Sequence, residues 1–215
     1  MSIDIRDIQT SKNAENVRLR RAVQIALDGI EQPATFLTFD GFGPHEEHFG
    51  IHFAVESAKG QPPTVRIHSE CISGDVFGSL RCDCGMQLKE AIRLMAQDGG
   101  LILYLRQEGR GIGFVAKMDA YNEQDAGYDT YTANTRLGFP EDSRDFAPAA
   151  QMLKAIGMTR IRLLSNNPEK AEQLSDHGIQ VVEMISTGVY CTEWNKRYLE
   201  AKRLRRGHQI NLLER

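Results

Sequence analysis

Three of the four cysteines of this 215-residue chain lie close together, in the pattern Cys71-x10-Cys82-x-Cys84. Thiolates are soft ligands that suit Zn²⁺, and tight clustering in a chain of this size indicates metal binding or catalysis rather than disulfides. A helix expected to begin at Cys84 would favour the thiolate of that residue through the helix dipole. We therefore predict a zinc site at these three cysteines and expect the fourth, Cys191, to be a small buried hydrophobic residue.

Three protein ligands would leave one coordination position open, as in catalytic zinc sites, where the pKa of bound water falls to about 7. Such water attacks electrophilic carbon, and Glu70, beside Cys71, could orient or deprotonate it. Two alternatives stay open. His68 could close the site as a structural Cys₃His centre, or the three thiols could be unliganded core residues. The second is less favoured because Asp83 and Gly85 indicate a turn.

A glycine-rich loop over residues 108–113 follows an apolar run at 101–105 and precedes an expected helix. This order directs backbone amides and a helix amino terminus at a phosphate. Arg110, between two glycines, is suited to phosphate oxygens, although a surface arginine is the simpler alternative. The pattern Gly111-x-Gly113-x-x-Ala116 fits a relaxed dinucleotide fingerprint, but residues 121–134 do not resemble the second strand that the fingerprint requires. A nucleotide substrate is therefore favoured over a nicotinamide cofactor.

The spacing of apolar residues predicts a helix over 13–27, within an amino-terminal helical extension of residues 1–33. Alternation then predicts antiparallel strands over 34–39 and 48–55. Residues 124–146 lack periodicity and are expected to form a ligand-binding loop. The remaining expected strands are 64–68, 101–105, 160–164 and 179–182, and the remaining expected helices are 84–96, 114–122, 148–156 and 168–177.

The fold class predicted from these elements is α/β, with a mixed β-sheet flanked by helices. The amino-terminal part is β-rich, and the alternation in the carboxyl-terminal half indicates βαβ units with parallel pairing. We assign residues 34–215 to a single catalytic domain, a size that can bury a core without disulfides or other staples.

Composition excludes several classes of protein. Hydrophobic residues make up 41% of the chain and charged residues 26%, which is ordinary for a globular protein. A net charge of -3 gives no general attraction to nucleic acid, and the basic residues between 196 and 206 are interpreted as a solvated helix face. No apolar run is long enough for a membrane span, and no signal sequence is recognised, so we expect a cytoplasmic protein without a membrane partner.

Four segments in register resemble GTP cyclohydrolase II: Arg66-Ile-His-Ser-Glu-Cys71, Gly78-Ser-Leu-Arg-Cys-Asp-Cys-Gly85, Arg106-Gln-Glu-Gly-Arg-Gly-Ile-Gly113 and Leu164-Ser-Asn-Asn-Pro168. The resemblance runs from about residue 63 to about residue 208. It implies zinc-dependent hydrolysis of GTP that opens the imidazole ring. The implied products are formate, pyrophosphate and 2,5-diamino-6-(5-phosphoribosylamino)pyrimidin-4-one, in the first step of riboflavin biosynthesis.

The resemblance also implies roles for individual residues. It places one Zn²⁺ per chain at the three clustered cysteines and Mg²⁺ on the substrate phosphates, in a homodimer. It implies Asp142 as proton acceptor, Arg144 as nucleophile toward the α-phosphate, and Tyr121 near the ring-opening site. Because a guanidinium stays protonated at ordinary pH, Arg144 could instead stabilise charge on the phosphate. The implied GTP contacts are Arg66, Ile67, His68, Ser69, Glu70, Gln87, Glu108, Gly109, Arg110, Thr130, Ser165 and Lys170.

Two departures from the family pattern leave other functions open. Ser165 stands where the family usually has threonine, which keeps the hydroxyl, and residues 135–142 are only loosely similar to the family's loop. One alternative is a paralogue in specialised metabolism or pyrimidine breakdown that stops at the formylated intermediate or uses another nucleotide. Retention of Tyr121 favours complete ring opening. The other alternative is a zinc- and nucleotide-binding module without catalysis.

Overall fold

The structure is a computed structural model that describes residues 17–55 and 60–206. These residues form two units, which we describe separately. The sheet unit comprises residues 17–55, 60–68, 90–106 and 146–187, and the helical unit comprises residues 69–89, 107–145 and 188–206. Among the described residues, every helix is too short or too polar to cross a bilayer.

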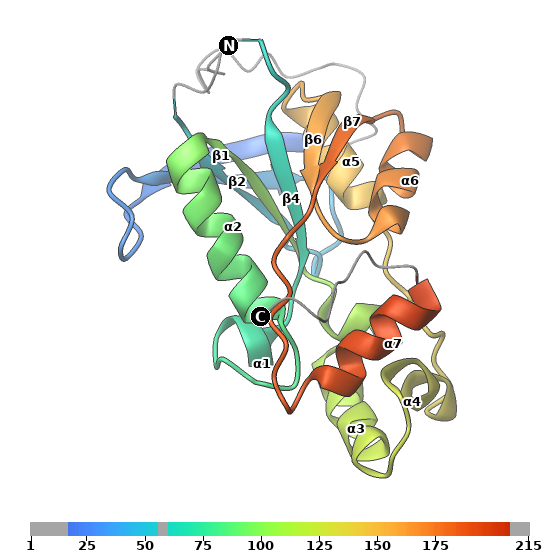
Figure 1. Ribbon diagram of the computed structural model, residues 1–215. Coiled ribbons are helices and arrows are strands. Elements are labelled where there is room, and N and C mark those ends of the chain that lie inside the picture. The colour runs from blue at the N-terminus through green and yellow to red at the C-terminus, as the bar shows by residue number, and fades with distance from the viewer. Residues whose placement is uncertain (1–16, 56–59, 207–215) are drawn as a thin grey trace. The chain divides into compact units, whose positions relative to one another are not determined.

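Seven strands of the sheet unit form one mixed sheet in the order β1-β2-β3-β5-β4-β6-β7 (Figure 1). The pairs β1–β2, β2–β3 and β3–β5 are antiparallel, whereas β4–β6 and β6–β7 are parallel. The predicted mixed α/β sheet, with its β-rich amino-terminal part, is thus confirmed. The strands are β1 (Arg18–Ile25), β2 (Ala34–Asp40), β3 (Phe49–Phe53), β4 (Thr64–Ser69), β5 (Gly100–Leu105), β6 (Arg160–Leu164) and β7 (Gln180–Ile185).

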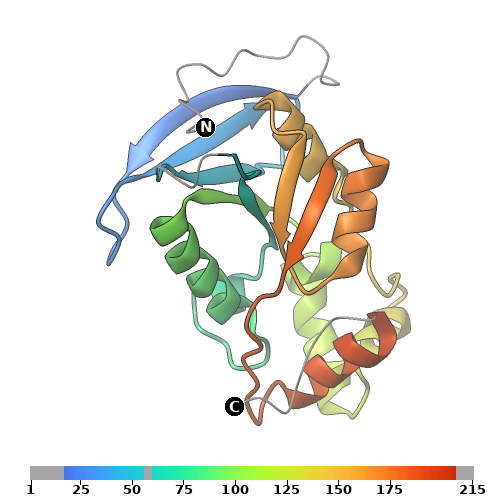
Figure 2. The same cartoon turned by 45° about the horizontal axis from the view of Figure 1, so that its top comes forward.

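The main core of the sheet unit lies against helix α5 (Ala147–Ala155). Side chains alternate along β5, so Leu101, Leu103 and Leu105 enter this core while Ile102 is buried on the other face. Helix α5 contacts β1, β5 and α6 (Pro168–Asp176), and α6 contacts β7 (Figure 2). The β6–α6–β7 segment is the parallel βαβ unit that the alternation predicted.

The helical unit contains the short helix α1 (Ile72–Asp75) and the first turns of α2 (Cys84–Asp98). Its other elements are the 3₁₀ turn η2 (Glu108–Gly111), α3 (Phe114–Asp125), α4 (Thr130–Arg136) and α7 (Lys196–Arg206). Helix α3 packs against η2 and α4, and α4 contacts α7. The predicted order of strand, glycine-rich loop and helix is confirmed by β5, η2 and α3.

The helix predicted over residues 13–27 is wrong where the structure describes it. Residues 18–25 form β1, which pairs with β2 along its length with an irregularity between Leu19 and Arg21. Local spacing gave a helical pattern, but Val23 and Ile25 are β-branched and strand pairing decides the conformation. Residues 13–16 lie outside the described part, and the domain boundary at residue 34 stays a prediction.

Three smaller expectations are also corrected. Part of the loop expected over 124–146 is helix α4, whose amino terminus is capped by the Asp129 carboxylate accepting from the amides of Tyr131 and Thr132. The basic helix at 196–206 is α7, in which Lys196, Arg197 and Arg203 are exposed as expected, whereas the side chain of Lys202 is only 13% exposed. Cys191 is exposed, not buried.

Candidate active site

The three clustered cysteines converge in the helical unit. Cys71 immediately precedes α1, Cys84 is the first residue of α2, and Cys82 lies two residues before it. Their Sγ atoms all lie within 4.8 Å of one another, and those of Cys71 and Cys82 are 3.6 Å apart. A tetrahedral Zn²⁺ with Zn–S bonds of about 2.3 Å holds its sulfur ligands about 3.8 Å apart. The three thiols therefore fit a zinc ion in chemistry and spacing.

Two glycines allow α1 and the start of α2 to meet around the thiols. A Cβ on Gly74 would lie 2.9 Å from the Sγ of Cys82 and 3.1 Å from that of Cys71. A Cβ on Gly85 would lie 2.1 Å from the carbonyl oxygen of Gly74. Neither position can hold a side chain without moving the chain, so the space around the sulfur atoms depends on both glycines.

No histidine belongs to this group of ligand-type side chains in the part of the chain that the structure describes. His68, the fourth ligand of the alternative structural site, is buried in the sheet unit, where its ring stacks on Tyr104 with centroids 5.5 Å apart. Three protein ligands are the number found in catalytic zinc sites, whereas structural sites generally have four.

The three thiols share their protons unequally. Hydrogen bonds from Cys82 and Cys84, together with the nearby Lys117 ammonium, hold the pKa of Cys71 far below its ordinary value. The hydrogen bond to Cys71 raises the pKa of Cys82 to about 11, and the bonds to Cys71 and Cys82 also raise the pKa of Cys84. Without metal the group thus favours one thiolate, and a bound metal ion would displace the protons of the other two.

A buried ion pair, which sequence reasoning missed, adjoins Cys71. Lys117 of α3 places its Nζ 2.7 Å from Oε1 of Glu108, 3.0 Å from Oγ of Ser73 and 3.2 Å from Sγ of Cys71. Burial opposes the charge of Lys117, but Cys71 and Glu108 outweigh it and raise the pKa of the lysine. Oε2 of Glu108 accepts a hydrogen bond from the amide of Ile72, at 2.7 Å.

Tyr121 lies in the same part of the helical unit. The Arg81 guanidinium lies 4.8 Å from the centre of its ring, and the Lys117 ammonium lies 5.7 Å from it. The same ammonium lies 3.2 Å from Sγ of Cys71. Burial raises the pKa of Tyr121, so the phenol stays protonated at neutral pH. The predicted catalytic tyrosine and Cys71 thus adjoin the same lysine.

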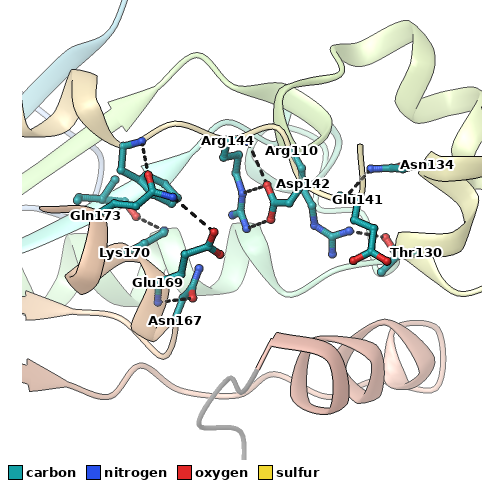
Figure 3. A network of polar contacts seen from close by, with 12 residues as sticks. Arg110, Thr130, Asn134, Glu141, Asp142, Arg144, Asn167, Glu169, Lys170 and Gln173 are labelled. Carbon is teal, nitrogen blue, oxygen red and sulfur yellow. Dashed lines mark hydrogen bonds and ion pairs between the residues drawn. The ribbon is translucent and has the colours of Figure 1, made fainter. Parts of the chain in front are cut away.

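Arg110 has an unusual backbone conformation, with φ of 62°, in the left-handed region that favours glycine. Its Nη1 donates to Oγ1 of Thr130 at 3.1 Å (Figure 3), and its guanidinium stacks 4.1 Å from the ring centre of Tyr131. Its Nη2 is buried and makes no hydrogen bond to any described residue. Arg110 is therefore not a surface arginine, and it has donor capacity for an anionic ligand.

Asp142 and Arg144 form a second buried pair of the helical unit, drawn in Figure 3. Oδ2 of Asp142 lies 2.6 Å from Nη2 of Arg144, and Oδ1 accepts from Nε at 2.9 Å and from the backbone amide at 3.1 Å. Burial opposes the charge of Asp142, but the Arg144 guanidinium outweighs it and lowers the pKa of the carboxyl. The carboxylate is thus ionised and holds Arg144 in one orientation.

The sheet unit positions another set of predicted residues. Nη1 of Arg66 donates to the carbonyl of Leu164 at 3.1 Å, and Nζ of Lys170 donates to the carbonyl of Ile67 at 2.7 Å. The side chain of Ile67 is fully buried in the core, so only its backbone could meet a ligand. Oγ of Ser165 accepts from the amide of residue 167, just before the start of α6.

Three more predicted polar contacts lie in the helical unit. Nε2 of Gln87 donates to Oδ2 of Asp83 at 2.7 Å, between the second and third cysteines. Oγ of Ser69 is buried and makes no hydrogen bond to any described residue. Glu70 is half-buried and follows it directly.

Sequence reasoning missed the two lysines that contact this part of the unit, Lys117 and Lys202. Nζ of Lys202, in α7, lies 3.0 Å from Oδ1 of Asp83, and the two side chains are 13% and 1% exposed. The local sequence does not show that either lysine forms an ion pair. Glu108 lies nine residues from Lys117, and Asp83 lies 119 residues from Lys202. Only the fold brings them together.

The mixed sheet and the three-thiol group together define an α/β protein with a cysteine group that could hold a metal ion. The model of the family GTP cyclohydrolase II matches residues 35–186, which is more than half of the chain. The chain therefore belongs to the GTP cyclohydrolase II family of hydrolases.

Relatives support this assignment over nearly the whole chain. The chain is 50% identical over 179 residues to GTP cyclohydrolase-2 of Vibrio cholerae serotype O1, covering 83% of this chain and 90% of the relative. It is 45% identical to GTP cyclohydrolase-2 of Aliivibrio fischeri strain MJ11, covering 91% and 98%. It is 41% identical to the riboflavin biosynthesis protein RibBA of Bacillus cereus, covering 98% of this chain and 53% of that longer protein.

Proposed function

We propose that the chain hydrolyses GTP in a zinc-dependent reaction that opens the imidazole ring. The proposed products are formate, pyrophosphate and 2,5-diamino-6-(5-phosphoribosylamino)pyrimidin-4-one, and the proposed pathway is riboflavin biosynthesis, in the cytoplasm. The observation that supports this most directly is the convergence of Cys71, Cys82 and Cys84 within 4.8 Å, in a member of this family.

The three cysteines would hold one Zn²⁺ per chain. A zinc ion with three protein ligands would supply a Lewis acid that activates water near neutral pH. Tyr121 lies near this group of cysteines, because the Lys117 ammonium lies 5.7 Å from the centre of its ring and 3.2 Å from Sγ of Cys71. We assign Tyr121 to the ring-opening step, where a protonated phenol can donate a hydrogen bond to a developing negative charge.

Arg110 and Arg144 are the proposed contacts for the phosphates, which would also carry Mg²⁺. Arg110 has a buried Nη2 without a protein hydrogen bond, and Thr130 fixes the other end of its guanidinium. Because Asp142 accepts three hydrogen bonds from Arg144, its carboxylate would orient this guanidinium. A charged Arg144 is suited to stabilise negative charge on a phosphate, and its permanent protonation disfavours nucleophilic attack.

The remaining proposed GTP contacts are the residues that the family resemblance implies. The carboxylate of Glu108 is already occupied by Ile72 and Lys117, and the side chain of Ile67 is in the core. For these two residues we therefore propose contact through the backbone. We also propose a homodimer, which light scattering after gel filtration would test. The other proposed contacts are Arg66, His68, Ser69, Glu70, Gln87, Gly109, Ser165 and Lys170.

The test is incubation of the purified, zinc-loaded protein with GTP and Mg²⁺. We expect loss of the purine absorbance together with one formate and one pyrophosphate for each GTP consumed. Pyrophosphate without formate would identify an enzyme that stops at the formylated intermediate. Binding of GTP without any product would identify a non-catalytic module and refute the proposed hydrolysis.

A further inference from the structure

Lys117 has no role in the proposed reaction, yet it is one of the most deeply buried charged residues of the helical unit. Its residue exposure is 8%, and its ammonium makes three polar contacts, to Glu108, Ser73 and Cys71. Burying a lysine costs hydration free energy and side-chain entropy. A hydrophobic residue of similar volume often gives equal or greater stability, so stability alone is weak grounds for a charge here.

Glu108 directs the lysine toward the sulfur. Its Oε1 accepts from Lys117 at 2.7 Å and from the amide of Gly109 at 2.8 Å, while its Oε2 accepts from the amide of Ile72 at 2.7 Å. Ile72 is the residue that follows Cys71 in the chain. One carboxylate therefore fixes both the lysine and the backbone beside the same cysteine.

The charges around Lys117 explain why a cation is favoured at this position. Three thiolates and one divalent cation have a net charge of about -1, and the Glu108 carboxylate adds a second negative charge nearby. The Lys117 ammonium lies between them, 3.2 Å from Sγ of Cys71 and 2.7 Å from Glu108. Without the lysine, these negatively charged groups would lie close together in a poorly hydrated space with no cation between them to offset their repulsion.

We propose that Lys117, held in place by Glu108, is a positioning residue that donates a hydrogen bond to the metal-binding sulfur of Cys71 and thereby retains the metal. This inference rests on the zinc site of the proposed function. Residues outside the coordination shell that orient a ligand typically contribute about 10–100-fold to metal affinity. The carboxylate of Glu108 is consequently committed to the metal side and not to GTP.

The experiment compares Lys117→Met with the full-length wild-type protein, using metal binding as the readout. Zinc affinity is measured by competition with a chromophoric chelator, and the ligand field is measured from the thiolate-to-cobalt charge-transfer band after Co²⁺ substitution. We expect Lys117→Met to bind zinc about 10–100-fold more weakly and to shift the charge-transfer band, because the sulfur loses its hydrogen bond. Lys117→Arg, which keeps charge and donors, should recover part of both.

Arg136→Met is the matched control, since it removes a cation from the exposed Arg136–Glu123 pair of the same unit. It should leave affinity and spectrum unchanged. Glu108→Gln provides a second variant if Lys117→Met does not fold, and it should also weaken zinc binding. The inference would be overturned if folded Lys117→Met showed wild-type zinc affinity and an unshifted charge-transfer band. If only Glu108→Gln folds, the same result in that variant would overturn it. Either result would leave the zinc site itself intact. A wild-type protein that binds neither metal would overturn the proposed zinc site and this inference with it.

Discussion

The two units hold their buried polar side chains in different ways. In the sheet unit, Arg66 and Lys170 donate to the main-chain carbonyls of Leu164 and Ile67. Asn166 likewise exchanges two hydrogen bonds with the backbone of Thr187, at 2.9 and 3.0 Å. Ile67 and Leu164 lie in strands β4 and β6, so strand register fixes the carbonyls that Arg66 and Lys170 contact.

In the helical unit the corresponding contacts join one charged side chain to another. The buried pairs are Lys117–Glu108, Arg144–Asp142 and Lys202–Asp83. Removing one member of a buried pair leaves an unpaired charge and costs about 3–5 kcal/mol, whereas losing one hydrogen bond to a buried carbonyl costs about 1–3 kcal/mol. We therefore expect the helical unit to be more sensitive to single substitutions than the sheet unit.

The largest effect is expected at the thiol group itself. Cys82→Ser replaces a soft sulfur with a hydroxyl that does not readily ionise, so the protein should lose its bound zinc and its GTP turnover. Metal content by elemental analysis and formate release would measure both. Cys191→Ser, at an exposed cysteine, is the matched control and should keep one zinc per chain. Equal zinc content in the two variants would show that Cys82 is not a ligand.

The next effect is expected at Asp142. Asp142→Asn keeps the shape of the side chain but removes the charge that orients Arg144, so turnover should fall about 100-fold, as on loss of one preorganised charge contact. The free energy of unfolding should fall by about 3 kcal/mol, since the largely buried Arg144 guanidinium loses the carboxylate that neutralises its charge. Asp119→Asn, at an exposed aspartate of α3, should change neither turnover nor urea denaturation.

A smaller effect, on stability alone, is expected for the Lys202–Asp83 pair. Its loss should lower the free energy of unfolding more than the loss of an ordinary surface ion pair would. Lys202→Met and Asp83→Asn should each lower the free energy of unfolding by about 3 kcal/mol. The double substitution should cost less than the sum by about 1–3 kcal/mol, because the second change removes a charge that the first left unpaired. Additive effects in urea denaturation at saturating zinc would show that α7 does not anchor the turn between Cys82 and Cys84.

The sheet was easier to predict than the helical unit, because strands follow local sequence patterns whereas the ion pairs of the helical unit depend on the fold. Strands 34–39, 64–68, 101–105 and 160–164 carry their apolar pattern locally, and each agrees with the structure to within about a residue or two. The exception is β1, where a locally helical pattern pairs with β2. Pairing partners are distant in the sequence, so local spacing cannot reveal them.

The candidate site shows the same division between local and distant signals. The cysteine pattern predicted a group of three thiols, and the glycine-rich loop predicted the placement of Arg110 between a strand and a helix. The ion pairs of Lys117 and Lys202 could not be predicted, because a lysine in a helix carries no mark of burial. Helix α4 was predictable in part, since Asp129 is a typical capping residue.

The smallest expected effect is on the pH dependence of stability, which should differ between a histidine of the sheet unit and an aspartate of the helical unit. His48 of the sheet unit is buried, its Nδ1 accepts a hydrogen bond from the amide of Arg106 at 3.0 Å, and burial lowers its pKa. Because the unfolded chain then binds a proton more readily than the folded one, stability is lost as pH falls below the unfolded pKa of about 6.5. For Asp142, whose pKa is lowered in the fold, stability is retained above about pH 4 and is lost only in stronger acid.

His48→Asn tests this difference, because an asparagine oxygen can accept the same hydrogen bond but does not titrate. The slope of unfolding free energy against pH between 6.5 and 5 should be shallower in His48→Asn than in wild type, by no more than about 1.4 kcal/mol per pH unit for one proton. Asp142→Asn should leave this slope unchanged, and its deficit of about 3 kcal/mol relative to wild type should shrink only as pH falls below about 4. His45→Asn, at an exposed histidine, serves as the control. A wild-type slope in His48→Asn would mean that the mild-acid sensitivity does not come from this residue of the sheet unit.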